Sequence, residues 1–223
     1  MAENSVVIIG RRHIIRLSPD TFNQLEEQAL PPECSELTGE AFTDGDTICA
    51  RTKQGLAVFI PHRTPLVHNL SAQQADELEI DSFEIMGKTV YFSLKQKNSH
   101  AANTLMAWDL VTGKQHTLFS CHSDINNSAD DTPAARKITG VIADRFQNRL
   151  LISIVPYPQG KRKVVGYYPR EQKFKDLKFD FSDGIRKGKT LQINGRHGDY
   201  VYIDLATGIE LCRLRNNAHS RLL

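Results

Sequence analysis

LMAWDLVTGKQHTLF, residues 105–119, has the pattern of two β-strands joined by a tight turn. Residues that favour β-structure lead up to Asp109, a Thr-Gly pair follows, and apolar residues then alternate with polar ones again. Residues 200–214, YVYIDLATGIELCRL, have almost the same pattern. Two copies of one pattern indicate that the chain is built from a repeating unit.

Three further segments have the same order of strand, polar turn and strand, and they begin at residues 13, 56 and 164. A Ser, Pro or Asp marks the turn in every segment. These turn residues are Ser18, Pro61, Asp109, Pro169 and Asp204. They follow one another at intervals of 43, 48, 60 and 35 residues, with a mean of 46.5. That mean lies within the roughly 40–50 residues of a four-stranded propeller blade.

Strand patterns also fill most of the sequence between these turns, and helical periodicity is nearly absent. Four of the five units have room for two earlier strands, whereas the first, which starts at SVVIIG (5–10), lacks an inner strand. The sequence therefore predicts an all-β fold, a small β-propeller of about five blades made of mostly antiparallel three- to four-stranded sheets. The predicted single domain covers residues 1–223, with blades at about residues 1–30, 31–70, 75–120, 137–177 and 178–214.

Two short stretches resemble known repeats. MAWDLVTGK (106–114) and YIDLATGIE (202–210) are similar to the third-strand turns of WD40 and quinoprotein-type β-propeller repeats. The resemblance implies a ring of blades, in which Trp108, Asp109 and Gly113 belong to the blade scaffold. A β-sandwich with irregular turns is the alternative fold, because regular turn patterns also occur in sandwiches.

Individual residues give three local expectations. PDTFNQLEEQAL (19–30) begins with candidate N-cap residues and is followed by two prolines, so a short helix is expected there. Trp108 is the only Trp in the sequence, and we expect it to pack within a blade rather than bind a ligand. His62 and His68 are six residues apart with Pro65 between them, which indicates surface turns rather than a metal site.

The composition is that of an ordinary globular protein, with 40% apolar and 24% charged residues. No run of 18 apolar residues is present, and the N-terminal residues lack the basic start of a signal peptide, so we expect a cytoplasmic protein. The four cysteines have none of the short spacings of a zinc site, and we expect structural or incidental roles for them. They are Cys34, Cys49, Cys121 and Cys212. We expect neither a metal nor a cofactor.

Charge is distributed unevenly along the chain. The net charge of +2 combines −6 over residues 1–50, +1 over residues 51–160 and +7 over residues 161–223. In a propeller, the connections between second and third strands open onto one end of the ring, and all five of these connections are basic. We therefore predict a basic rim, which would favour an anionic partner. The predicted rim residues are Arg11, Arg12, Arg51, Lys53, Lys95, Lys97, Lys161, Arg162, Lys163 and Arg196. The alternative is that Lys and Arg simply suit exposed hairpin tips.

Motifs of catalysis are absent from the sequence, which has no G-x-S-x-G elbow, no H-E-x-x-H and no P-loop. Asp124, Asp130 and Asp131 lie in a polar segment (121–137) without the closing Glu of a calcium loop, so a connection between blades is expected there. The leading hypothesis is a non-enzymatic protein–protein interaction module. One alternative is binding of nucleic acid or another phosphorylated ligand by the basic rim, and another is an enzyme with its site in the central channel.

We expect another protein as the partner, no contact with a membrane, and either a monomer or a homodimer that completes a blade. The sequence leaves open whether residues 215–223 supply the missing strand of the first unit. It also leaves open whether the chain is a fragment of a longer protein.

Overall fold

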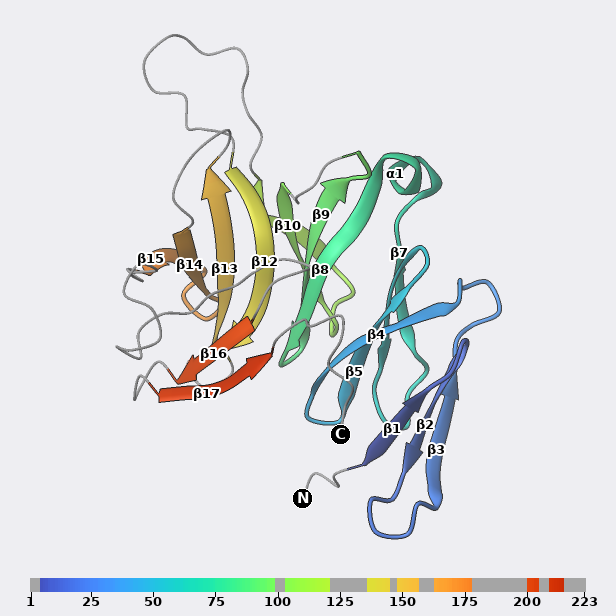
Figure 1. Ribbon diagram of the computed structural model, residues 1–223. Coiled ribbons are helices and arrows are strands. Elements are labelled where there is room, and N and C mark those ends of the chain that lie inside the picture. Colours follow the sequence, from blue (N-terminus) through green and yellow to red (C-terminus); the bar gives the residue numbers. More distant parts are fainter. Residues whose placement is uncertain are drawn as a thin grey trace, which may run out of the picture. The chain divides into compact units, whose positions relative to one another are not determined.

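The computed structural model describes residues 5–98, 103–120, 136–144, 148–156, 163–177, 200–204 and 209–214. The chain divides into two compact units. The first unit comprises Met1–His100 with Thr104–Phe119, and the second comprises Ala101–Asn103 with Ser120–Leu223. In both units the strands form antiparallel sheets in which each strand pairs with the next one along the chain (Figure 1).

The first unit contains three sheets. The first sheet consists of β1 (Val6–Ile9), β2 (His13–Leu17) and β3 (Gln24–Ala29). The second consists of β4 (Leu37–Asp44), β5 (Thr47–Thr52), β6 (Gly55–Phe59) and β7 (Leu66–Asn69). The third consists of β8 (Leu78–Met86), β9 (Thr89–Gln96), β10 (Thr104–Asp109) and β11 (Gln115–Ser120).

The second unit contains a four-stranded sheet and a two-stranded sheet. The four-stranded sheet consists of β12 (Arg136–Asp144), β13 (Arg149–Pro156), β14 (Lys163–Tyr168) and β15 (Lys173–Leu177). The two-stranded sheet consists of β16 (Tyr200–Asp204) and β17 (Ile209–Leu214). The further strands expected at residues 178–182 and 190–195 lie outside the described residues. The all-β prediction and the antiparallel sheets of three to four strands are confirmed.

The expectation of a helix at residues 19–30 is wrong, because residues 24–29 form β3. This strand pairs with β2, and it turns Glu26 and Gln28 toward the second sheet, where both side chains find hydrogen-bonding groups. Tertiary pairing therefore outweighs the local helical pattern. The α-helix within the described residues is α1 (Ala72–Glu77).

α1 begins with a capping box. The Ser71 hydroxyl accepts the N–H of Gln74 at 3.2 Å, and the Gln74 side chain accepts the N–H of Ser71 at 3.1 Å. The pattern S-x-x-Q is a recognised helix start, so this helix could have been predicted from the sequence.

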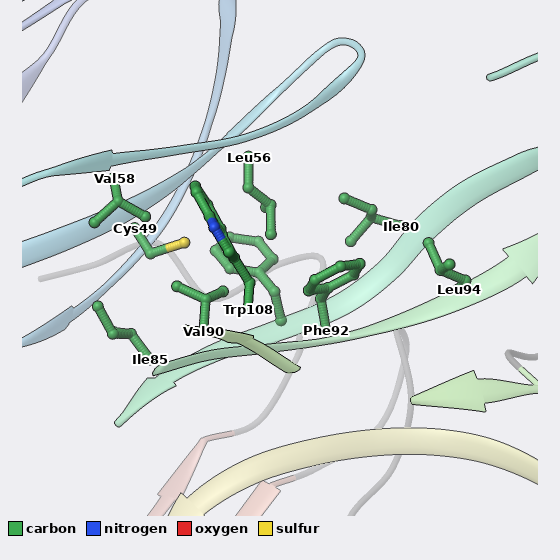
Figure 2. Close-up of a cluster of buried hydrophobic side chains, with 10 residues drawn as sticks. Cys49, Leu56, Val58, Ile80, Ile85, Val90, Phe92, Leu94 and Trp108 are labelled. Atoms are coloured by element: carbon green, nitrogen blue, oxygen red, sulfur yellow. The ribbon is translucent and has the colours of Figure 1, made fainter. Parts of the chain in front are cut away.

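The second sheet is buried on both of its faces. Successive side chains of a strand point to opposite faces, and β6 has five buried residues in a row. Leu56 and Val58 pack in the cluster shared with the third sheet, which Figure 2 shows together with Trp108. Ala57 and Phe59 pack in the cluster shared with the first sheet. The first unit is therefore a stack of three sheets with two cores.

A register break recurs in the first strand of all three four-stranded sheets. It follows four or five regular pairs counted from the hairpin turn. The breaks lie between Leu37 and Ala41, between Ile80 and Phe83, and between Ile138 and Gly140. Such breaks bend a strand and increase its twist, so their repetition gives the three sheets a common shape.

The hairpin turns repeat as well. Seven of the described turns carry one residue in the left-handed region, with φ between 49° and 70°. Gly45, Gly87 and Asn148 occupy the turns between first and second strands, and Phe22, His62, Gly113 and Gln172 occupy the turns between the last two strands. In the turn of the opening sequence, the Asp109 carboxylate accepts the N–H groups of Val111 (2.8 Å) and Thr112 (2.9 Å). Both bonds lower the pKa of the Asp109 carboxyl, and the bond from Thr112 has the larger effect.

Candidate functional site

Arg12, one of the predicted rim residues, clamps the segment that leads into β4. Its guanidinium donates to the carbonyl oxygens of Pro31 and Cys34, both at 2.9 Å, and of Pro32 at 3.1 Å. The guanidinium thus binds three carbonyl oxygens of one loop, of which that of Pro31 also accepts the N–H of Cys34 at 3.0 Å. The side chain of Arg12 is committed to the fold rather than to a ligand.

Arg51 connects the register breaks of the second and third sheets. Its guanidinium donates to the Ile80 carbonyl and, at 3.1 Å, to the Asp81 carbonyl. It also forms an ion pair with Glu40 and lies 5.1 Å from the centroid of the Phe83 ring. A charged donor in a half-buried position gains more from such bonds than it would in water. Arg51 therefore stabilises the contact between the two sheets.

Lys95 is buried, although a basic rim requires exposed cations. Its side chain is 8% exposed, and its Nζ lies 2.8 Å from Glu79 Oε1 and 3.4 Å from Asp81 Oδ1. Lys53 pairs with Glu36 at 2.8 Å on the surface. The hydrogen bond from Lys53 lowers the pKa of Glu36. Lys95 thus has carboxylate partners in its own sheet, and Lys53 has one in the segment just before β4.

Arg11 and Lys97 are exposed, as the basic rim requires. Lys163 lies in β14, and its side chain is not among those described. Lys161, Arg162 and Arg196 lie outside the described residues, as do the acidic residues at 124, 130 and 131. Arg51 and Lys95 therefore both contact Asp81 of the third sheet, and the complete rim stays a prediction.

A second charged group holds the first sheet against the second. The Arg16 side chain is 6% exposed and lies 3.4 Å from Glu26 Oε2, and it donates to the Asp46 carbonyl at 2.7 Å. Burial lowers the pKa of Arg16, an effect that Glu26 and Asp46 oppose. Gln28 donates to two carbonyl oxygens of the second sheet, those of Ile60 (2.8 Å) and Arg63 (2.6 Å).

His68 is not in a surface turn, so that part of the expectation is wrong. It lies in β7, with its ring centroid 5.2 Å from that of Phe92 and 5.7 Å from that of Trp108. Its Nδ1 lies 2.7 Å from Gln115 Nε2, and burial lowers its pKa. His62, by contrast, is 88% exposed in the turn before β7, as expected. Trp108 is buried, which confirms its predicted packing role.

Exposed apolar side chains gather on the first sheet. Four of the seven large apolar side chains that are exposed among the described residues belong to this sheet and its β2–β3 turn. They are Val6 (39%), Ile8 (48%), Phe22 (66%) and Leu25 (50%). This surface could not be predicted from the sequence, because VVII is a continuous apolar run, which suggests burial on both faces. A continuous apolar run at the edge of a sheet has no sequence feature that marks its exposed face.

Among the described residues, no group of three or more His, Cys, Asp and Glu side chains is arranged to hold a metal ion. Cys34 and Cys49 are free and buried, and burial raises the pKa of both thiols. In the same part of the chain, no helix has the length and apolar character needed to cross a membrane.

No protein-family model matches the sequence, and no curated protein matches it. Among solved structures, similar chains include the N-terminal domain of Nup159 (TM-score 0.41, 10% identity, 78% of this chain and 40% of that one). A protein of unknown function from Bacteroides caccae has a TM-score of 0.42 and 13% identity over 95% of this chain and 73% of that one. The dihydro-heme d1 dehydrogenase NirN has a TM-score of 0.44 and 12% identity over 97% of this chain and 54% of that one.

This chain thus spans 40% of the Nup159 domain and 54% of NirN. These similarities assign it no function. Its own four-stranded antiparallel meanders resemble the blades of β-propeller repeat proteins, as the sequence predicts.

Proposed function

We propose that this chain is a non-enzymatic protein–protein interaction module built on a small β-propeller of about five blades. The observation that carries the proposal is the concentration of exposed apolar side chains on the first sheet. Isolated exposed apolar residues are normal on a protein surface, but several on one sheet favour a surface that another protein covers. The partner is therefore another protein that buries the side chains around Val6, Ile8, Phe22 and Leu25.

The propeller itself is supported by the burial of the second sheet. In a two-layer β-sandwich, each sheet keeps one face in solvent. The second sheet instead packs against a neighbour on each side, through Val58 on one face and Phe59 on the other. A ring of blades has this arrangement throughout. The number of blades and the single domain over residues 1–223 are part of the proposal.

The proposal is tested by recovering partners from native lysate with the tagged full-length chain. We expect one protein in about equal amount to the chain, and we expect the double variant Phe22→Ser with Leu25→Ser to lose it. Val111→Ser is the matched control, because Val111 is 69% exposed but lies in the turn of the third sheet. Absence of a stoichiometric partner, or equal loss with both variants, would refute the proposal.

A second candidate function is binding of nucleic acid or another phosphorylated ligand by the predicted basic residues. The exposure of Arg11 and Lys97 favours it. Affinity for a single-stranded oligonucleotide would fall steeply with salt, and reversal of charge over residues 161–163 would weaken it. Affinity that stays constant as salt rises rejects this candidate. A cytoplasmic location and the choice between a monomer and a blade-completing homodimer stay predictions.

A further inference from the structure

β1 differs from the other edge strands of the described sheets. Register breaks interrupt four of the other edge strands, which are β4, β8, β12 and β16. Polar or charged residues occur in the remaining ones, which are β3, β7, β11, β15 and β17. β1 has four β-branched apolar residues and an unbroken register with β2. Proteins protect exposed sheet edges with breaks and charges, because an unprotected edge pairs with other strands. β1 is thus suited to receive an additional strand.

The backbone of β1 presents hydrogen-bonding groups to its open edge. Gly10 N–H donates to the His13 carbonyl at 2.8 Å, so these two residues form a hydrogen-bonded pair. Bonded and non-bonded pairs alternate along an antiparallel ladder. Ile8 therefore bonds to β2, whereas the N–H and C=O groups of Val7 and Ile9 point away from it. Among the described residues, β1 pairs with β2 alone.

The side chains of β1 add an apolar surface on one side of this edge. Val6 and Ile8 are exposed, and they lie opposite Leu17 and Ile15 of β2 in the register. Val7 and Ile9 point to the other face and pack against the core shared with the second sheet. A strand added beside β1 would therefore place every second side chain against apolar neighbours on the outer face.

Charge indicates the chemistry of that strand. Residues 1–50 have a net charge of −6, and the exposed Glu27 lies on the outer face opposite Ile15. The same acidic segment of a second copy would be repelled, whereas a basic strand would be attracted. We propose that β1 accepts an extended, basic segment of a partner protein in which apolar residues alternate with Lys or Arg. This inference rests on the proposed interaction function and gives it a surface and a partner chemistry.

The first test uses the full-length chain and a synthetic decapeptide of alternating Val and Lys. Two control peptides have Glu in place of Lys, or N-methyl groups on every second amide, which remove the donors needed for strand pairing. We expect calorimetry to give a dissociation constant at least about ten-fold lower for the Val–Lys peptide than for either control. Equal affinity for the N-methylated peptide would overturn the proposal.

The second test places the peptide on β1. We expect the amide hydrogens of Val7 and Ile9 to exchange rapidly in the chain alone and slowly with the peptide bound, as measured by NMR. Ile8→Lys should abolish peptide binding, whereas Ile8→Thr should largely retain it. Slow exchange without peptide at every protein concentration means that the chain covers its own edge. Slow exchange that increases with protein concentration means that a second copy covers it. Either result overturns the proposal.

The lysate experiment separates failure of this inference from failure of the proposed function. If the Ile8→Lys variant still recovers the stoichiometric partner, β1 is not the binding edge, but the chain remains an interaction module. If neither variant nor the unmodified chain recovers a partner, the proposed function itself fails.

Discussion

The second sheet contacts its two neighbours through different chemistry. Toward the third sheet, Leu56 and Val58 meet the aromatic rings of Phe92 and Trp108 in an apolar core (Figure 2). Toward the first sheet, the core around Phe59 is bordered by buried polar side chains. Both interfaces contain directional bonds, but those of Arg51 toward the third sheet come from a side chain that is 16% exposed, whereas Arg16 and Gln28 toward the first sheet are buried.

The interface with the first sheet is the more polar of the two, because its polar side chains are more deeply buried. Arg16 and Gln28 donate to carbonyl oxygens in the turns of the second sheet, and the Glu26 carboxylate accepts the N–H of His62 at 2.7 Å. Each bond has a defined direction, so the interface fixes the position of the first sheet. It also has a cost, because Gln28 Oε1 is buried without a hydrogen-bond partner among the described residues. Loss of one polar group should therefore change the orientation of the first sheet as well as the stability of the fold.

The largest expected effect lies in the apolar interface. Phe92 is 1% exposed, and Phe92→Ala would leave a cavity beside His68 and Trp108. We expect the free energy of unfolding to fall by about 3–5 kcal/mol, as for other buried Phe-to-Ala changes. Urea titration followed by Trp fluorescence measures it. Phe92→Leu, which keeps most of the volume, should cost about 1 kcal/mol. A cost below about 1 kcal/mol for the alanine variant would show that this interface is loosely packed.

The next effect tests the polar interface. Arg16→Met leaves the Glu26 carboxylate, which is 15% exposed, without its cation. We expect a loss of about 3 kcal/mol, because a buried charge without its partner is costly. The double variant Arg16→Met with Glu26→Gln should recover part of this loss. If the double variant is no more stable than Arg16→Met, the two residues are not coupled.

A smaller effect separates two residues that the sequence treats alike. Arg51 donates to two backbone carbonyls of the third sheet, whereas Lys53 makes a surface pair with Glu36 in which the Lys53 side chain is 64% exposed. We expect Arg51→Met to lower the unfolding free energy by about 2 kcal/mol and Lys53→Met by less than about 0.5 kcal/mol. Chemical denaturation of both variants under identical conditions gives the comparison. Equal losses would mean that Arg51 acts as an ordinary surface cation.

Strand positions could be predicted from the sequence because they depend on local alternation and turns. The strand pattern that begins at residue 56 corresponds to β6 and that at residue 164 to β14, and the turn at Asp109 has the expected scaffold role. The helix expected at 19–30 failed because β3 pairs with β2 and its Glu26 and Gln28 bond to residues of the second sheet more than 30 positions away, contacts that local propensity does not contain.

The partners of individual charges could not be predicted. Arg51, Lys95 and Arg12 look like exposed loop cations in the sequence, yet each meets oxygen atoms from a different strand or loop. These contacts depend on which sheets pack together and on where the register breaks occur. The register break after Ile80 places the Ile80 carbonyl within hydrogen-bonding distance of Arg51. No residue pattern in β8 predicts this break. A site built from such contacts becomes visible only in three dimensions.

The smallest expected effect concerns pH and His68. Burial against Phe92 and Trp108 disfavours the charged imidazole and lowers the pKa of His68 below its usual 6.5. The unfolded chain therefore binds a proton more readily than the folded chain. The stabilisation from the neutral ring is fully present above about pH 6.5 and is lost as the pH falls through the folded pKa.

His68→Phe isolates this contribution, because a phenyl ring keeps the aromatic packing and does not titrate. The unfolding free energy of the unmodified chain should fall more steeply between about pH 7 and about pH 5 than that of the variant. Carboxylates elsewhere in the chain titrate in both proteins, so the difference between the two slopes reports His68 alone. If the variant has the steeper slope, the folded chain stabilises charged His68 instead. That result would reject burial by the aromatic rings as the cause, and the Gln115 amide would not explain it either, because its Nε2 can donate only to an unprotonated Nδ1.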